Sequence, residues 1–423
     1  MKTKNQAARV LAIALLASAA QAGDDPMGFA EFDQRATAGA RLNVAFFGAS
    51  LTWGANSSDP LKTSYRARMA EKLEARYPEA RFKFIDGAIG GTGSDLGVFR
   101  LQRDCLAYKP DLVFLDFTAN DDVRNPRPER LCAYESLVRR IVVEGRCPLV
   151  VVVFPFKWDA VPGTAGDMPG RLAHRRIAEA YGAPIGDAIV HVQNLTAADP
   201  SLPARLWPLD GAHPCDEGYA LFADAAWQGL REGIEKKLVC KAPEAMLHAD
   251  TYMTWSRNRL SRMKNVPDCW KPELVSRTSA WFDGLMSRWL DDVMVVRNFT
   301  LEKDATSGKS VRSPVDVKPL VVKFRAASVL VYGEETVKSG QYRAIVDGKP
   351  VTIPQKNGPD LETFDLSGKR FGGGRQHYAM IATGLDAQVD HTLEIHPVFA
   401  EDEAQELRLE SICLAGGEAK ILE

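Results

Sequence analysis

Four short segments of this sequence carry residue types that could perform acyl transfer. They are FFGASLTWG (46–54), GAIGGTGSD (87–95), TANDD (118–122) and LDGAHPCDEGY (209–219). The first holds Ser50 in a small-residue turn, and the third holds Asn120. The second is rich in glycines that leave backbone N–H groups open. The last places Asp210 three residues before His213. Together they offer a nucleophile, a base, an orienting acid and amide donors.

These residue types complement one another in the hydrolysis of an ester. A serine hydroxyl is a poor nucleophile at its own pKa and needs an adjacent base, which His213 can provide. Asp210 can fix the tautomer of that imidazole and stabilise the imidazolium. The developing oxyanion needs preorganised donors, and the Asn120 amide and two backbone N–H groups can supply them.

Each segment also has an ordinary structural interpretation. Serine and asparagine are common in turns, so Ser50 and Asn120 could serve the backbone alone. A glycine-rich loop after a strand could hold phosphate, but neither GxxxxGK[ST] nor GxGxxG occurs, which disfavours a nucleotide site. A single histidine is more often structural, although an aspartate three residues before His213 favours a functional pair.

The elements around these segments alternate between strands and helices from about residue 40 to 238. Apolar, β-branched or aromatic runs predict strands at 41–47, 81–86, 110–117 and 148–156. Helical stretches are predicted at 61–77, 128–145, 171–182 and 216–238. This alternation is typical of a parallel sheet covered on both faces. Ligands bind at the carboxyl ends of the strands in such sheets, and Ser50 lies just past one of those ends.

The four segments resemble the sequence blocks of the SGNH (GDSL) hydrolases. The matching stretches are GASLTWG, AIGGTGS, TAND and DGAHP, in this order. The resemblance assigns Ser50 as the nucleophile and adds Asp210 and His213 as the other members of its triad. It assigns Gly91 and Asn120 to the oxyanion hole, together with Ser50. It implies the flavodoxin-like three-layer α/β/α fold of that family.

The resemblance covers roughly residues 40 to 238, and two positions depart from the family pattern. The usual aspartate before the serine is Ala49, and the usual glycine before the asparagine is Ala119. Neither position supplies a triad or oxyanion group, so we expect activity to survive. The GxSxG motif of the α/β-hydrolases is absent, and the order Ser first and Asp-x-x-His last argues against that fold.

The sequence changes character after residue 238. Residues 239–305 contain four of the eight tryptophans: Trp255, Trp270, Trp281 and Trp289. We favour packing in a core or interface for these rings over stacking on sugars. From about residue 306, short alternating segments with Gly/Asp turns predict a β-sandwich, with a hairpin turn at 346–349. This part resembles the jelly-roll modules that accompany some SGNH carbohydrate esterases.

The sequence therefore predicts four regions. They are a signal peptide at 1–22, an SGNH hydrolase domain at 38–238, a Trp-rich connecting region at 239–305 and a β-sandwich accessory domain at 306–423. The first region has basic residues, a short apolar core and small residues at 20 and 22, which indicate cleavage after Ala22. We expect export to the periplasm or the extracellular space. The apolar stretch is too short to span a bilayer.

Composition limits the partners and cofactors. A formal net charge of -2 gives no reason to expect nucleic acid or an anionic membrane as a partner. The seven cysteines are an odd number, which leaves at least one thiol free unless a bond is intermolecular. Their spacing defines no pairing and suggests no zinc site, so we expect neither a metal nor a cofactor. The oligomeric state is not indicated.

Together these expectations predict an exported serine esterase that hydrolyses short acyl esters. The favoured substrate is an O-acetylated carbohydrate. Trp53, Trp158 and Trp207 lie close in sequence to site segments or strand ends and could line the cleft, or could pack between loops. Two alternatives stay open: a lipolytic esterase or lysophospholipase on the same scaffold, and a non-catalytic glycan-binding protein. The five retained site residues disfavour the second alternative, and the lack of an obvious lid segment disfavours the first.

Overall fold

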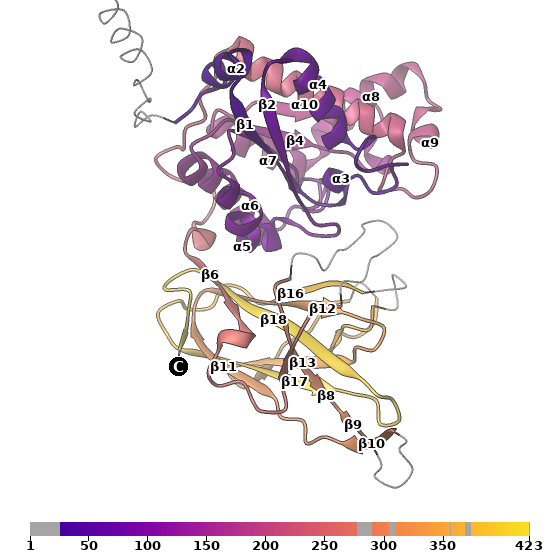
Figure 1. Ribbon diagram of the computed structural model, residues 1–423, viewed down its shortest axis with the longest axis vertical. Coiled ribbons are helices and arrows are strands. Elements are labelled where there is room, and N and C mark those ends of the chain that lie inside the picture. The colour runs from indigo at the N-terminus through magenta and orange to yellow at the C-terminus, as the bar shows by residue number, and fades with distance from the viewer. Residues whose placement is uncertain (1–25, 277–289, 304–309, 356, 369–373, 423) are drawn as a thin grey trace, which may run out of the picture.

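The structure is a computed structural model, and it describes residues 26–276, 290–303, 310–355, 357–368 and 374–422. The predicted signal peptide at 1–22 and two of the tryptophans, Trp281 and Trp289, lie outside these residues. The chain forms an α/β part followed by an all-β part, as predicted (Figure 1).

The α/β part is built on a five-stranded parallel sheet with the strand order β2-β1-β3-β4-β5. The strands are β1 (Arg41–Gly48), β2 (Arg81–Ala88), β3 (Leu112–Leu115), β4 (Leu149–Val153) and β5 (Ile185–Asp187). The first four confirm the predicted strands. The prediction misses β5 because its three residues, IGD, contain no apolar run.

Helices cover both faces of this sheet. They are α2 (Phe29–Thr37), α3 (Ser50–Trp53), α4 (Tyr65–Arg76), α5 (Ser94–Asp104), α6 (Pro128–Arg140), α7 (Pro169–Ala180), α8 (Ala188–Ala198), α9 (Leu202–Leu206) and α10 (Asp216–Glu235). Figure 1 shows α5 and α6 on one side of the sheet and α4 and α10 on the other. In α4, Ser64 caps the first turn, and the buried Tyr65, Met69 and Leu73 recur at the four-residue spacing of one helix face.

Within the described residues, the all-β part contains two six-stranded antiparallel sheets and a separate two-stranded antiparallel sheet. Its strands are β6 (Trp255–Arg259), β7 (Lys271–Glu273), β8 (Val293–Arg297), β9 (Phe299–Lys303), β10 (Ser310–Pro314), β11 (Leu320–Arg325), β12 (Ser328–Glu335), β13 (Gln341–Val346), β14 (Lys349–Pro350), β15 (Phe364–Asp365), β16 (Arg375–Ala382), β17 (His391–Val398), β18 (Glu406–Ala415) and β19 (Lys420–Leu422). One six-stranded sheet has the order β16-β12-β18-β8-β7, with β6 added on β18. The other six-stranded sheet has the order β14-β13-β17-β11-β19, with β15 added on β13, and β9 and β10 form the two-stranded sheet. This arrangement confirms the predicted β-sandwich.

Two local features of the sandwich bear on the sequence analysis. Strands β6, β7 and β8 come from the stretch 239–305, which we expected to connect the two domains, and they pair within the first sheet. The predicted hairpin turn at 346–349 is confirmed by the pairing of β13 with β14. Asp347 and Gly348 both have positive φ, 51° and 75°, as a type I′ turn requires.

The β6-containing sheet packs against the α/β part. Tyr332 of β12 and Cys413 of β18 are buried in the same apolar cluster as the α/β core. At this interface the Arg140 guanidinium lies 4.5 Å from the ring centre of Trp255. The two parts therefore share one continuous buried core, and β16 lies next to the α/β part in Figure 1.

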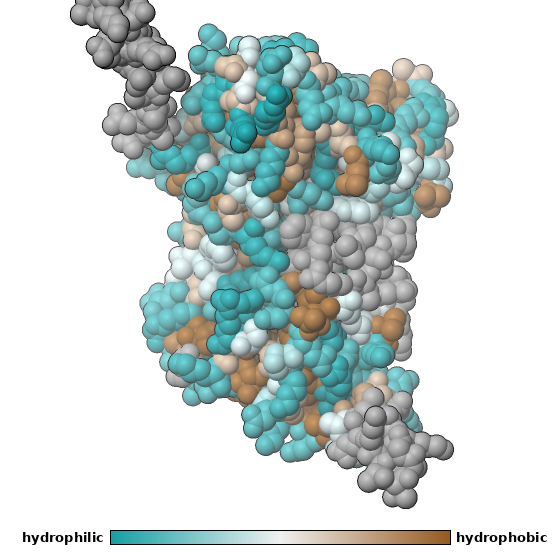
Figure 2. Space-filling model, viewed as in Figure 1, coloured by the Kyte–Doolittle hydropathy of each residue, from teal (hydrophilic) through white to brown (hydrophobic). Residues whose placement is uncertain are grey.

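The surface seen in Figure 2 is mostly polar, with apolar side chains in separate patches. Large exposed apolar residues are scattered over the chain, among them Leu61, Leu274 and Trp158. Within the described residues, no helix combines the length and the apolar character needed to cross a bilayer.

All seven cysteines are free thiols. Cys105, Cys147, Cys240 and Cys413 are buried. Burial raises the pKa of Cys105 to about 12 and that of Cys240 to about 11. A buried thiol of this kind is chemically inert, so these residues serve packing.

Candidate active site

Ser50 begins helix α3 directly after the carboxyl end of β1. Its side chain is buried, with 4% of the residue exposed. The turn before it requires glycine at position 48, because a Cβ there would lie 2.5 Å from the Asp116 carbonyl oxygen. The strand-to-helix turn therefore holds the hydroxyl at the edge of the sheet that the sequence analysis singled out.

The structure joins Ser50, His213 and Asp210 in one chain of hydrogen bonds. His213 Nε2 lies 2.9 Å from Ser50 Oγ, and His213 Nδ1 lies 3.0 Å from Asp210 Oδ2. Because a carboxylate only accepts, Nδ1 carries the proton and Nε2 is left to accept from the hydroxyl. This is the arrangement in which an imidazole can act as a base toward serine.

Asp210 is held in its ionised form by several donors. Its Oδ1 accepts 2.7 Å hydrogen bonds from the backbone N–H groups of Ala212 and His213. Burial alone would raise the pKa of Asp210, but these bonds and the one from the imidazole outweigh it and lower the pKa. The carboxylate therefore remains available to orient His213.

Asn56 is a further partner of this carboxylate that the sequence analysis missed as a site residue. Its Nδ2 donates to Asp210 Oδ2 at 2.9 Å. Asn56 follows α3 and has a φ of 66°, a conformation that asparagine tolerates better than most residues. No local pattern indicates this contact, because the two residues are 154 positions apart.

The segments with Gly91 and Asn120 lie on either side of Ser50. They follow β2 and β3, the two strands that flank β1 in the sheet. Gly91 has a φ of 72°, which a residue with a side chain would adopt only with strain. The Ile89 N–H donates to the Gly48 carbonyl at 3.2 Å, which ties the Gly91 segment to the turn before Ser50.

Arg130 of α6 links the Gly91 and Asn120 segments, and the sequence analysis missed it. Its guanidinium donates to the Asn120 carbonyl and to Asp95 Oδ2, the latter at 3.0 Å. In addition, Asp121 Oδ1 accepts from the Ser94 N–H at 2.9 Å. The two loops are therefore fixed relative to each other by charged hydrogen bonds, which are the stronger kind.

Arg100 of α5 likewise links two site segments, through the ends of β1 and β2. It is 2% exposed and donates to the Gly48 carbonyl at 2.7 Å and to the Gly87 carbonyl at 2.5 Å. Asp104 lies 3.4 Å away and balances its charge. Since both carbonyls belong to the last residues of β1 and β2, Arg100 fixes the base of the Ser50 and Gly91 turns.

A buried polar layer adjoins the helix of Ser50. Thr52 Oγ1 donates to Asp116 Oδ2 at 3.0 Å, and burial raises the pKa of Asp116 to about 7. Thr118 Oγ1 and His174 Nδ1 are 2.9 Å apart, and burial lowers the pKa of His174 to about 3. Near neutral pH this histidine is uncharged, and Asp116 titrates.

The three tryptophans proposed as cleft residues have different surroundings. Trp158 is 54% exposed, and its ring lies against Gly211, where a Cβ would be 2.7 Å from the indole. Trp207 is 2% exposed and packs near Phe222, and its Nε1 donates to the Ala212 carbonyl at 3.4 Å, which corresponds to the alternative of packing between loops. Trp53 is partly buried at the end of α3.

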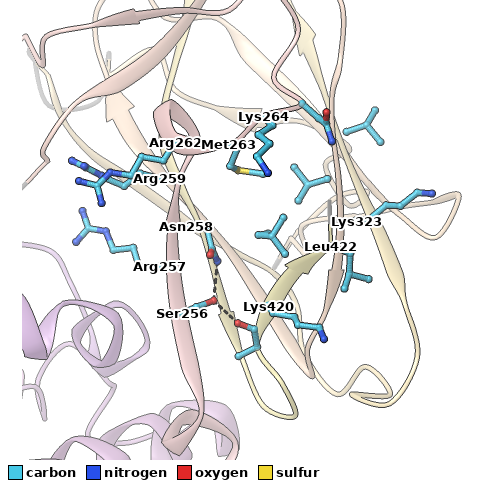
Figure 3. A pocket seen from close by; sticks show the side chains of 15 residues that line it. Ser256, Arg257, Asn258, Arg259, Arg262, Met263, Lys264, Lys323, Lys420 and Leu422 are labelled. Carbon is cyan, nitrogen blue, oxygen red and sulfur yellow. Dashed lines mark hydrogen bonds between the residues drawn. The ribbon is translucent and has the colours of Figure 1, made fainter.

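A separate cavity of ≈ 680 Å³ lies in the sandwich between β6 and β19 (Figure 3). Arg257, Arg259, Arg262 and Lys264 line one side. Arg257 is paired with Glu410, and Arg259 is paired with Asp291 and Asp292. In Figure 3, Ser256 of β6 donates to the carbonyl of Ala419, the residue before β19, and Asn258 donates to Ser256 within β6. None of the lining residues belongs to the Ser50 site.

Among the solved structures that match this chain, the following two span both of its parts. A two-domain esterase (CEX) active on acetylated mannans is 23% identical, with a TM-score of 0.67 over 92% of this chain and 95% of that chain. The same kind of esterase co-crystallised with mannopentaose is 23% identical, with a TM-score of 0.68 over 93% of this chain and 97% of that chain. This likeness shows that the two-domain fold is shared. No curated protein matches the sequence.

The family comparison covers the segments that carry the chemistry. Residues 46–221 match the model of the GDSL-like Lipase/Acylhydrolase family. This range includes all four segments from the serine to the Asp-x-x-His pair. The α/β part of the chain is therefore similar to the GDSL-like lipase/acylhydrolase family over the segments that carry the candidate site.

Proposed function

We propose that this protein is an exported serine esterase that removes short acyl groups, above all O-acetyl groups, from carbohydrate. The observation that carries the proposal is the hydrogen-bond chain Ser50–His213–Asp210 at the carboxyl edge of the sheet. The segments of Gly91 and Asn120 flank this chain and supply the oxyanion donors. Export rests on the sequence pattern of residues 1–22.

The first chemical step forms an acyl-enzyme. His213 Nε2 takes the proton of Ser50 Oγ while the oxygen attacks the acyl carbon, and the carbonyl oxygen becomes an oxyanion. The backbone N–H groups of Ser50 and Gly91 and the Asn120 amide donate to this oxyanion. When the intermediate collapses, the carbon–oxygen bond to the alcohol breaks, and His213 gives its proton to the leaving oxygen.

The second step repeats this chemistry with water. His213 Nε2 accepts a proton from a water molecule whose oxygen attacks the acyl carbon of the Ser50 ester. The second tetrahedral intermediate then releases the carboxylic acid, and the proton returns to Ser50 Oγ. Asp210 stabilises the imidazolium in both steps without itself being protonated, in keeping with its lowered pKa.

Two features support a carbohydrate as the alcohol. The exposed Trp158 ring lies against Gly211, within the Asp210–His213 loop, and offers the aromatic face on which sugar rings stack. The matching two-domain esterase is active on acetylated mannans, and it shares the fold of both parts of this chain. We therefore propose an acetylated polysaccharide, with acetylated mannan as the first candidate.

The acyl chain length tests this proposal without requiring the correct glycan. Each methylene that enters an apolar groove contributes about 0.8 kcal/mol of binding, so a lipolytic enzyme prefers long chains. We expect kcat/KM on p-nitrophenyl esters to fall from acetate to butyrate and to be small for octanoate. A maximum at octanoate would contradict the proposal and favour the lipolytic alternative. Acetate release from acetylated mannan, with acetylated xylan in parallel, then identifies the polysaccharide.

A further inference from the structure

We infer that Gln376 and Tyr378 of the β-sandwich are positioning residues for the oxyanion loop, so that the sandwich is part of the catalytic apparatus. Gln376 Nε2 donates to the Gly90 carbonyl at 2.7 Å. Tyr378 Oη donates to the Gly91 carbonyl at 3.2 Å. The inference rests on the proposed role of the Gly91 N–H as an oxyanion donor.

The geometry of the peptide bond makes the Gln376 contact specific. The Gly90 carbonyl and the Gly91 N–H belong to the same planar trans peptide and point in opposite directions. A donor that holds the Gly90 oxygen therefore also sets the direction of the Gly91 N–H. The same hydrogen bond polarises the peptide unit, which makes that N–H a better donor.

Tyr378 secures the next peptide along the chain. Its hydroxyl holds the Gly91 carbonyl, so the peptides on both sides of the Gly91 Cα are fixed by β16. Gly91 needs such support because its φ of 72° is only one of the many conformations open to a glycine. A Cβ at this position would meet a single neighbour within 4 Å, Gln376 Nε2 at 3.8 Å.

The placement of the two side chains follows from the strand period. Residues 376 and 378 point to the same face of β16, which turns toward the α/β part. His377 between them points the other way, and its Nε2 lies 3.0 Å from Tyr342 Oη inside the sandwich. Strand β16 is itself anchored, because it pairs with β12 along seven residue pairs.

The burial of Gln376 indicates that its hydrogen bond to Gly90 does more than hold the sandwich against the α/β part. The residue is 2% exposed, and its Oε1 has no hydrogen-bond partner within the described part of the chain. A buried amide oxygen without a partner costs stability. An apolar side chain would avoid that cost, but it could not hold the Gly90 carbonyl.

The test compares three variants of the full chain: Gln376→Leu, Tyr378→Phe and the control Tyr342→Phe. The control also removes a tyrosine hydroxyl, but Tyr342 is buried in the sandwich and its hydroxyl contacts His377 and not the oxyanion loop. The measurements are kcat and KM on p-nitrophenyl acetate, the melting temperature, and the inhibition constant of methylboronic acid. The tetrahedral boronate on Ser50 places an oxygen in the oxyanion hole, so its affinity reports the hole directly.

We expect Gln376→Leu to lower kcat by about 10-fold to 100-fold, the range seen when groups that orient reacting residues are removed. KM should stay nearly constant, and the boronate inhibition constant should rise by a factor similar to the loss in kcat. Tyr378→Phe should show the same pattern to a smaller degree. Tyr342→Phe should lower the melting temperature and leave kcat unchanged.

The inference is overturned if Gln376→Leu and Tyr378→Phe keep kcat and boronate affinity within about twofold of the wild type. Tyr378→Phe decides the matter alone if Gln376→Leu does not fold, since it retains the aromatic ring. Ser50→Ala separates this failure from a failure of the proposed function. Loss of activity in Ser50→Ala with normal Gln376→Leu refutes only the inference, whereas an active Ser50→Ala variant refutes both.

Discussion

The α/β part and the β-sandwich place their buried polar residues in different ways. In the α/β part, Ser50 and the Gly91 and Asn120 segments follow the carboxyl ends of adjacent strands, where backbone groups are open toward a ligand. In the sandwich, buried charges pair with one another inside the sheet, as Arg408 Nε does with Glu334 Oε2 at 2.8 Å.

This difference indicates that the α/β part carries the reacting groups we propose, whereas the paired charges of the sandwich stabilise its strands. Charges that are fully paired within a sheet are satisfied and stabilise one arrangement of the strands, but they have no capacity left for a substrate. Gln376 and Tyr378 depart from this pattern because they donate outward, to the loop of Gly91. The comparison predicts that substitutions in the α/β site change rates, whereas substitutions within the sandwich change stability.

Removal of the proposed nucleophile should have the largest effect. Ser50→Ala eliminates the atom that we propose forms the acyl-enzyme, so kcat/KM on p-nitrophenyl acetate should fall by about 10⁴-fold or more. The exposed Ser201, whose hydroxyl contacts Asp199, provides the control variant Ser201→Ala, which should keep full activity. A folded Ser50→Ala protein with most of its activity would exclude Ser50 as the nucleophile.

Breaking a buried ion pair of the sandwich should affect stability alone. Arg257 contacts Glu410 through two hydrogen bonds of 2.6 and 3.1 Å, and Glu410 is fully buried. Arg257→Met leaves that carboxylate unpaired and should lower the free energy of unfolding by about 3–5 kcal/mol, with kcat unchanged. The exposed pair of Arg231 and Glu235 gives the control Arg231→Met, which should change stability by less than about 1 kcal/mol. A large loss of kcat in Arg257→Met would contradict the separation of roles.

Removal of the proposed oxyanion donor Asn120, which follows β3, should have the next largest effect. Asn120→Ala removes a side-chain amide that we propose stabilises the transition state, so kcat should fall by about 10²–10³-fold with little change in KM. The nearby Asn125 donates to Asp122 from the same loop, and Asn125→Ala should retain wild-type kinetics. An effect of Asn120→Ala on KM alone would instead assign the residue to substrate binding.

Asn56 should have a smaller effect because it acts through Asp210. Asn56→Ala removes the 2.9 Å hydrogen bond to Asp210 Oδ2 and loosens the carboxylate that orients His213. We expect kcat to fall by about 10-fold at constant KM. Asn43→Ala is the matched control, because its amide contacts the Tyr108 carbonyl near the opposite end of β1. Equal kinetics for the two variants would remove Asn56 from the site.

The smallest effect concerns the dependence of stability on pH. The pKa of Asp116 is about 7 in the folded protein and 3.8 for an ordinary aspartate, so the folded state holds a proton that the unfolded chain releases between these values. The contribution of Asp116 to stability therefore decreases as pH rises through this window. Asp116→Asn cannot ionise, so the variant should gain a few degrees in melting temperature relative to the wild type between about pH 5 and about pH 8. A constant difference across this range would contradict the raised pKa.

Much of the candidate site could be predicted because its residues lie in short segments of fixed spacing. Asp210 and His213 are three positions apart, and a loop of that length can close their hydrogen bond locally. Ser50, Gly91 and Asn120 each follow a strand whose apolar run is visible in the sequence. Since parallel strands end at the same edge of a sheet, the topology brings these segments together.

The tertiary structure alone decided which side chains hold those segments in place. Gln376 lies 286 positions from its partner Gly90, and Asn56 lies 154 positions from Asp210. A single hydrogen bond between distant residues leaves no periodicity or spacing in the sequence, because it depends on how two separately folded surfaces meet. Trp207 gives the converse case: its position before Asp210 suggested a cleft residue, whereas packing against the core decided that it is buried. The sequence by itself thus determined the candidate reacting groups and the sheet that carries them. Packing between the two parts of the chain determined which distant side chains hold the segments of those groups in place.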